Sequence, residues 1–206
     1  MNFEEIVKLS PEISNVFDYE VFENVINLLG KDEVHILEIG SWKGASAVAW
    51  SEICIKKGIK YSVECLDCWD NSPKTTSNFV WKMFEEEKGQ NKKNYECFLK
   101  NTKDYNISHK KIPYSYPIFW NEHRASRGTY DIVYYDAAHD KNSTFNSLIY
   151  WSPKASYMVV DDYFEGFDKQ QLWQKECTIG INLAADYLGK TIVKQSATNK
   201  VIYWEC

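Results

Sequence analysis

The chain has 206 residues, and its 24 basic and 29 acidic side chains give a formal net charge of -5. Proteins that neutralise nucleic-acid phosphates usually carry a net positive charge, so this balance disfavours a nucleic-acid partner. No stretch approaches the roughly 18 apolar residues of a membrane span, and the amino end lacks the pattern of a secretion signal. We therefore expect a cytoplasmic protein without a membrane partner.

The length and the cysteines favour one ordinary globular domain. A chain of this size can bury one substantial core, so we expect a single domain over residues 1–206, with 1–30 as an N-terminal helical cap. Six scattered cysteines predict free thiols rather than a disulfide scaffold. Cys65 and Cys68 form one C-x-x-C pair, which is only half of a structural zinc site, so we do not expect zinc.

The first third of the chain predicts a helix followed by a strand-helix-strand unit. Asp18 can cap a helix that stops at Gly30 and covers one edge of a sheet. Apolar strands at 34–39 and 61–66 then flank a helix over about 45–57. Strand, helix and strand within that length indicate a right-handed parallel unit.

The remaining elements continue the alternation of helix and strand. They are a helical stretch over 74–100 with a break near Gly89, an extended piece at 111–116, strands at 131–136 and 157–162 with a crossover helix over 141–151, a helix over 168–188, and a hairpin of 191–195 with 200–205. This order predicts an α/β fold with a doubly wound, mostly parallel sheet and a C-terminal antiparallel hairpin. Such sheets bind ligands outside the carboxyl ends of the strands.

A glycine turn after the first predicted strand is the strongest sign of a ligand site. Gly40 and Gly44 permit close approach of a ligand to the backbone, and the helix that follows directs unpaired N–H groups toward it. The spacing G-x-x-x-G lacks the third glycine of the dinucleotide fingerprint. Glu38, two residues before Gly40, would repel a pyrophosphate and suits a cationic ligand.

Asp67 ends the second predicted strand, where a carboxylate can accept both hydroxyls of a ribose. The alternative is that Asp67 is a loop acid that caps the next turn.

Three more aspartates end the later strands, namely Asp136, Asp161 and Asp162. Carboxylates that converge on one rim repel one another unless a cation lies among them, and ligands that are all oxygen suit Mg²⁺. The alternative is that Asp162 points into solvent and Asp161 caps a loop. His139 follows Asp136 by three residues and can act as a general base near neutral pH. The alternative for His139 is a surface or structural role.

Taken together, residues 34–165 resemble a class I S-adenosylmethionine-dependent methyltransferase, and within that group the small O-methyltransferases that include the macrocin and catechol enzymes. The matching stretches are 37–46, Asp67 in Leu66-Asp67-Cys68-Trp69, 131–139 and 159–163. The resemblance implies a Rossmann-like fold and places Glu38 near the methionine part or the sulfonium of the cofactor. It also implies that Asp67 holds the ribose.

The resemblance further implies a full set of site residues. The cofactor-binding set is Glu38, Gly40, Ser41, Trp42, Gly44, Ser46, Asp67, Ser115, Tyr116 and Asp136, with Ser115 and Tyr116 at the adenine edge. Mg²⁺ is expected on Asp136, Asp161 and Asp162. His139 stands where the catechol enzymes have the lysine that deprotonates the substrate, which makes His139, with Asp136, the catalytic pair.

The expected function is metal-assisted O-methylation of a small-molecule hydroxyl, on a sugar or a catechol-like vicinal diol. One alternative is a relative of this superfamily with a hydroxylase-like or binding-only role. A second is a nicotinamide-dependent oxidoreductase, which the strand-turn-helix unit and Asp67 favour and which Glu38 and the missing glycine disfavour. Homodimers are common among the similar enzymes, which leaves a homodimer open.

Overall fold

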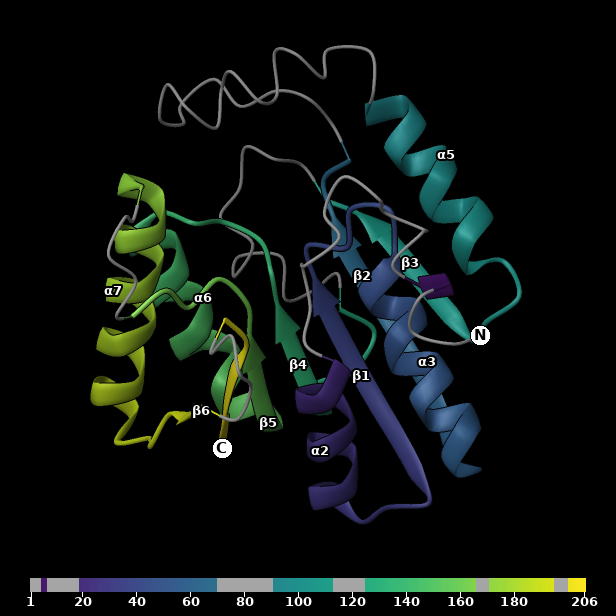
Figure 1. The fold of residues 1–206 in the computed structure, drawn as a ribbon, viewed down its shortest axis with the longest axis horizontal. Coiled ribbons are helices and arrows are strands. Elements are labelled where there is room, and N and C mark those ends of the chain that lie inside the picture. Colours follow the sequence, from purple (N-terminus) through teal and green to yellow (C-terminus); the bar gives the residue numbers. More distant parts are fainter. Residues whose placement is uncertain (1–4, 7–18, 70–90, 113–124, 166–170, 195–199) are drawn as a thin grey trace.

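The structure is a computed structural model, and it describes residues 5–6, 19–69, 91–112, 125–165, 171–194 and 200–206. The described residues form a seven-stranded sheet with helices on both faces (Figure 1). In chain order the elements are α2 (Tyr19–Leu29), β1 (Glu33–Ile39), α3 (Ala45–Lys57), β2 (Lys60–Asp67), α5 (Asn91–Thr102), β3 (Ile107–Lys111), β4 (Tyr130–Tyr135), α6 (Lys141–Trp151), the 3₁₀ turn η3 (Ser152–Lys154), β5 (Ala155–Val160), α7 (Leu172–Leu188), β6 (Val193–Lys194) and β7 (Ile202–Glu205).

The strand order is β3-β2-β1-β4-β5-β7-β6. β1 is central and pairs in parallel with β2 on one side and with β4 on the other. At the other end of the sheet β7 pairs antiparallel with both β5 and β6. The predicted fold class is confirmed, and the reversal of strand order beside β1 is where sheets of this kind bind ligands.

Alternation along the strands divides the core into two layers. In β1, Val34 and Ile36 contact the layer built by α2 and α3, whereas Leu37 and Ile39 contact the layer built by α6 and α7. Because successive side chains of a strand point to opposite faces, a strand with both faces buried is apolar at nearly every position. Both faces of the sheet are therefore covered.

Helix α2 lies on a face of the sheet, which corrects the expectation that it covers an edge. The Phe22 ring stacks on the Trp50 ring of α3 with centroids 3.8 Å apart, and it meets the Tyr134 ring of β4 edge-on at 5.0 Å. Four consecutive core-facing positions of α2 are fully buried: Val21, Phe22, Val25 and Ile26. A helix at an edge would leave part of this stripe exposed.

Helices α3 and α6 have the predicted bounds because their ends carry clear signals. Gly58 takes a left-handed φ of 69°, and its N–H donates to the last turn of α3, which ends the helix. Asp140 caps α6, since its side chain accepts a hydrogen bond from the Ser143 N–H. In the described part of the chain, no helix is long and apolar enough to cross a membrane.

Two elements start at different residues from those predicted. Strand β3 occupies Ile107–Lys111 at the sheet edge, earlier than the predicted 111–116, and its half-buried polar residues give no apolar signal. Helix α7 begins at Leu172, because Gln171 and Gln174 form a reciprocal capping box there. The predicted cap Asp18, the helical stretch 74–90, and residues 113–116, 168–170 and 195 lie outside the described residues.

Candidate active site

The carboxyl ends of β1, β2 and β4 are joined by backbone contacts around Gly40. The Gly40 N–H donates to the Leu66 carbonyl at 2.9 Å, and the Asp136 N–H donates to the Ile39 carbonyl at 2.9 Å. Gly40 has a φ of 89°, and a Cβ added to it would lie 1.8 Å from the Asp136 carbonyl oxygen. Only glycine permits this approach, so the glycine turn and the Asp136 loop form adjacent walls of one site.

Gly44 ends the same turn and precedes α3, with a left-handed φ of 82°. A Cβ there would meet Thr102 and Phe98 of α5 at 2.8 and 2.9 Å, whereas a Cβ at Gly58, also left-handed, would meet nothing within 4 Å. Since both replacements are strained but only one is crowded, Gly44→Ala should lower the free energy of unfolding by about 1–2 kcal/mol more than Gly58→Ala. Urea denaturation of the two variants checks this, and equal losses would contradict it.

Asp67 ties the end of β2 to the glycine turn. Its Oδ2 accepts the backbone N–H groups of Ser41 and Trp42 at 2.7 and 2.8 Å, and its Oδ1 accepts the N–H of Trp69 at 2.9 Å. A carboxylate has about four acceptor positions, so these bonds leave one, on Oδ1. Asp67 thus hydrogen-bonds both the glycine turn and the start of its own loop.

Trp69 is a site residue that sequence reasoning did not assign. Its indole Nε1 donates to the Trp42 carbonyl at 2.7 Å, which fastens the loop after β2 to the glycine turn. Trp42 and Trp69 both have positive φ, at 45° and 39°, which is uncommon for bulky residues. Trp69 directly follows the Leu66-Asp67-Cys68 stretch, and this position was the available signal.

Glu38 lies fully buried below the glycine turn. Its Oε1 accepts the hydroxyl of Ser46 in α3 at 3.0 Å, while none of the described residues hydrogen-bonds to its buried Oε2. Burial raises the pKa of Glu38 to about 8, against the opposing effect of the Ser46 hydrogen bond. A buried carboxyl with an unused oxygen fits a cationic ligand, which would supply both a partner and a compensating charge.

Asp161 and Asp162, the two acids that follow β5, differ in their hydrogen-bond partners. Asp161 is 2% exposed, its Oδ2 accepts the Tyr134 hydroxyl at 3.1 Å, and its Oδ1 accepts the N–H of Asp162 at 2.6 Å. Asp162 has a left-handed φ of 63°, and its Oδ2 lies 3.2 Å from His139 Nδ1. Asp161 therefore contacts Tyr134, whereas Asp162 contacts His139.

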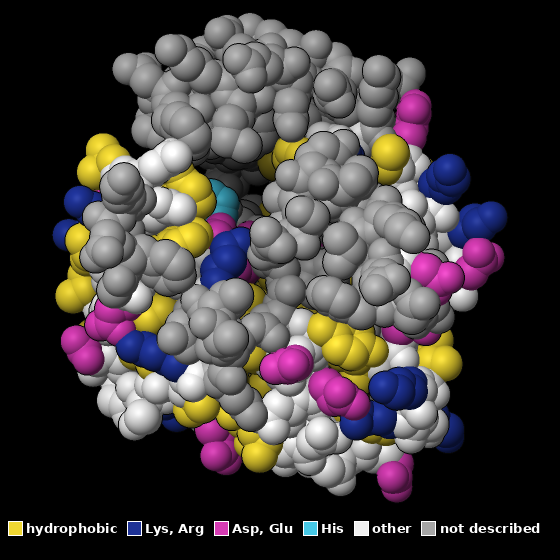
Figure 2. All heavy atoms as spheres, viewed as in Figure 1, with side chains coloured by type: hydrophobic (Ala, Val, Ile, Leu, Met, Phe, Trp, Pro, Cys, Tyr) yellow, Lys and Arg dark blue, Asp and Glu magenta, His cyan; other side chains and the backbone are white. Residues whose placement is uncertain are grey.

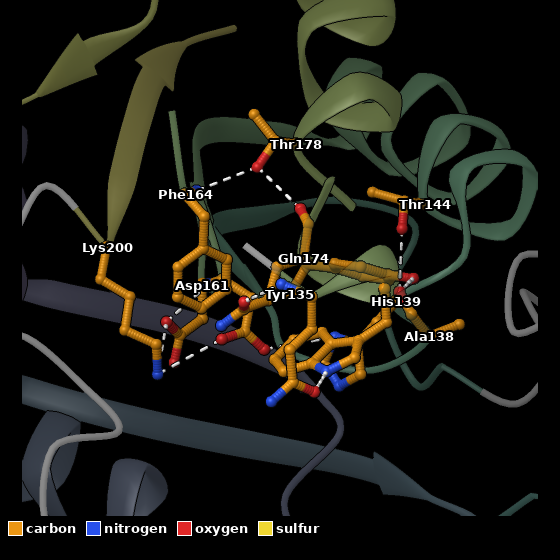
Figure 3. Close-up of polar contacts among 12 residues, drawn as sticks. Tyr135, Ala138, His139, Thr144, Asp161, Phe164, Gln174, Thr178 and Lys200 are labelled. Atoms are coloured by element: carbon orange, nitrogen blue, oxygen red, sulfur yellow. Dashed lines mark hydrogen bonds and ion pairs between the residues drawn. The ribbon is translucent and has the colours of Figure 1, made fainter. Parts of the chain in front are cut away.

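Lys200 lies beside both of these acids. Its Nζ is 3.5 Å from Asp161 Oδ1 and 3.3 Å from Asp162 Oδ1 (Figure 3). Sequence reasoning did not assign this lysine, and its only signal was its place as the first residue of the second hairpin strand. Because β7 lies next to β5, Lys200, two residues before the start of β7, falls beside the acids that follow β5.

His139 meets the other side of Asp162, with its Nδ1 3.2 Å from Asp162 Oδ2. The preceding residue is fixed, since the Ala138 carbonyl accepts the hydroxyls of Thr144 and Tyr135 at 2.9 and 3.1 Å (Figure 3). Figure 2 shows histidine, acidic and basic side chains together in a hollow of the surface.

Asp136, His139 and Asp162 each offer one potential metal ligand, and these three atoms lie within 4.8 Å of one another. The structure thus brings together two of the three predicted metal ligands with the predicted base, while Asp161 contacts Tyr134 and Lys200 instead. Carboxylate oxygens and an imidazole fit a divalent cation. Ser115 and Tyr116, predicted at the adenine edge, lie outside the described residues.

The cluster brings three acids, Asp136, Asp161 and Asp162, together with one lysine, Lys200. Burial raises the pKa of Asp136, and the charges of Asp161 and Asp162 raise it further. Burial also raises the pKa of Asp161 to about 7, with a further contribution from Asp162. Burial acts to lower the pKa of Lys200, but the neighbouring acids outweigh it and raise that pKa. A further cation at this rim would be favoured electrostatically.

The sheet order, the glycine turn beside a buried acid and the acids at the strand ends define a Rossmann-like methyltransferase. A family model described as "Methyltransferase domain" matches residues 37–163. This match spans more than half of the chain, and the chain belongs to that family. No curated protein matches the sequence.

Solved structures of similar fold are also methyltransferases. The O-methyltransferase NovP has a TM-score of 0.63 at 16% identity, over 91% of this chain and 78% of NovP. An O-methyltransferase from Bacillus cereus in complex with SAH has a TM-score of 0.56 at 12% identity, over 99% of this chain and 90% of that one. The SAH-bound methyltransferase PaMTH1 of Podospora anserina has a TM-score of 0.56 at 15% identity, over 98% and 85%. At these identities the likeness concerns the fold.

Proposed function

We propose that this chain transfers the methyl group of S-adenosylmethionine to a hydroxyl oxygen of a small molecule, with the help of a divalent metal ion such as Mg²⁺. The observation that carries the proposal is the contact between the two halves of the site. The turn above Glu38 touches the loop that bears Asp136 and His139, since a Cβ at Gly40 would lie 1.8 Å from the Asp136 carbonyl. A donor at the turn would therefore lie next to an acceptor at the acids.

On the donor side, the residues of the glycine turn account for recognition of a cation. Glu38 would face the positive charge of the methionine part, with Ser46 holding the other carboxylate oxygen. Asp67 keeps the turn in shape through Ser41 and Trp42 and has one acceptor position for a ribose hydroxyl. The SAH named with two of the similar structures supports this choice of donor.

On the acceptor side, Asp136 and Asp162 would hold Mg²⁺. When bound, Mg²⁺ supplies Lewis-acid stabilisation of a deprotonated hydroxyl oxygen. His139 accepts the proton, because Asp162 engages its Nδ1 and so leaves Nε2 as the acceptor in the matching tautomer. Thr144 and Tyr135 fix the loop of His139 through the Ala138 carbonyl, which holds the base in place.

Aromatic rings beside His139 favour an acceptor with a flat or sugar ring. The Trp173 ring of α7 lies 5.2 Å from the His139 ring, and the Phe164 ring lies 5.6 Å from Trp173. Such side chains stack on ring faces and exclude water from them. A catechol or a sugar with vicinal hydroxyls is therefore the proposed acceptor class.

Calorimetric titration of the purified protein with S-adenosylmethionine, with and without Mg²⁺, tests the donor assignment. We expect a dissociation constant on the order of micromolar and no detectable binding of NAD or NADP. Transfer of labelled methyl groups to catechols and sugar diols then tests the acceptor. Absence of S-adenosylmethionine binding in both buffers would refute the proposal, and binding of a nicotinamide cofactor would favour the oxidoreductase alternative.

A further inference from the structure

We propose that Lys200 is a resident counter-cation of the acid cluster, which withholds Asp161 from a divalent metal and weakens metal binding at the site. The inference rests on the proposed metal-assisted function and assigns a role to a residue outside the expected ligand set. In this proposal Asp161 pairs with Lys200, and the other acids remain for the metal.

Lys200 is held in place by its backbone as well as by its charge. Its carbonyl accepts the Tyr163 N–H at 2.9 Å, which joins the segment before β7 to the loop after β5. The Lys200 side chain is 23% exposed, and its Nζ lies 6.0 Å from the centroid of the Phe164 ring. The Lys200 side chain is therefore anchored at its backbone and mostly buried where it meets the acids.

Asp161 has little capacity left for a metal. Its side chain is 0% exposed, and its two oxygens already meet the Tyr134 hydroxyl, the N–H of Asp162 and the Lys200 ammonium. Asp162 is different, because its Oδ1 faces Lys200 and its Oδ2 faces His139. Asp162 thus contacts both Lys200 and the group of potential metal ligands. Asp161 contacts Lys200 but is not one of that group.

Two effects follow from this division. A divalent cation on the Asp136 side of Asp162 is repelled by a fixed ammonium a few ångströms away, so its affinity is lower than three acids would otherwise provide. Without a metal, Lys200 offsets part of the negative charge of the cluster and stabilises the fold. Removing the lysine charge should therefore strengthen metal binding and weaken the metal-free protein.

The test compares Lys200→Met with the wild-type protein, using Mg²⁺ alone as the titrant in calorimetry and thermal unfolding with and without Mg²⁺. We expect Lys200→Met to bind Mg²⁺ at least about tenfold more tightly, to unfold at a lower temperature without metal and to regain stability when Mg²⁺ is added. Lys200→Arg keeps the charge and should bind Mg²⁺ about as the wild type does.

Lys194→Met is the matched control, since Lys194 is exposed and pairs with Glu165 outside the cluster. It should leave Mg²⁺ affinity unchanged. If Lys200→Met does not fold, Lys200→Gln, which keeps a hydrogen-bond donor, carries the same expectation. Mg²⁺ binding by the uncharged variant that is equal to or weaker than wild type overturns the inference, as does the absence of Mg²⁺ binding in both. S-adenosylmethionine binding, measured on the same samples, reports separately on the proposed function.

Discussion

The affinity for S-adenosylmethionine should strengthen by about tenfold for each pH unit between about pH 6 and pH 8, and then level off. Burial raises the pKa of Glu38 to about 8, so the ligand-free protein keeps Glu38 protonated below that pH. A cationic ligand favours the ionised carboxylate, so binding releases this proton, and the release becomes easier as the pH rises. Calorimetric dissociation constants across this range measure the slope.

Glu38→Gln is the control for this prediction, because it keeps the shape and hydrogen bonding of the side chain without its titration. The variant should bind more weakly at pH 8, and its slope should retain only the titration of the ligand's own amino group. The other titratable groups that interact with Glu38 among the described residues are Asp67, Cys65, Tyr134 and Asp136, and all remain in the variant. Equal slopes for the two proteins would show that Glu38 does not meet the cation.

The raised pKa of Glu38 should also make the free energy of unfolding depend on pH. Between the ordinary carboxyl pKa of 4.5 and the raised value of about 8, the folded protein binds a proton that the unfolded chain does not. The free energy of unfolding therefore falls as the pH rises through this window, by about 1.4 kcal/mol per pH unit from this group. Ligand binding should remove most of that loss, because it stabilises the ionised form.

Replacement of His139 by glutamine should lower kcat by roughly 10²–10⁴-fold and leave S-adenosylmethionine affinity unchanged. The His139 ring touches Asp162 on one nitrogen, which leaves the other to take the acceptor proton, and glutamine cannot accept a proton at neutral pH. Steady-state kinetics with the best acceptor and calorimetry with the methyl donor separate the two effects.

His35→Gln provides a matched control for the His139 prediction. His35 lies near the amino end of β1, where its Nδ1 meets the Ser62 hydroxyl, at the opposite end of the strand from the site. Its replacement should change kcat by less than about threefold. A His139→Gln variant whose kcat matches that of His35→Gln would remove His139 from the chemistry.

The sequence predicted the parts of this protein whose signals are local. The Gly58 stop, the Asp140 cap and the apolar strand cores act within a few residues, and α3, α6 and the central strands lie where those signals indicate. The gathering of acids at one rim also follows from the sequence, because parallel strands present their carboxyl ends to the same edge of the sheet.

Which acid contacts Lys200 and which contacts His139 depends on features that are not local in the sequence. Lys200 reaches the acids because β7 pairs with β5, and Asp162 reaches His139 from a backbone with a φ of 63°. Neither the pairing partner of a short strand nor a positive φ at an aspartate can be read from residue type. The start of β3 was missed for a related reason, since an edge strand needs few apolar residues.

The central position of β1 also bears on how the chain folds. Ile36 of β1 pairs with Ile132 of β4, so the second neighbour of this strand comes 96 residues later in the chain than the strand itself. Pairings over such separations slow folding, and until β4 arrives an apolar strand has one unpaired edge. Refolding yields should therefore decline as protein concentration rises, because intermolecular strand pairing then competes with the arrival of β4.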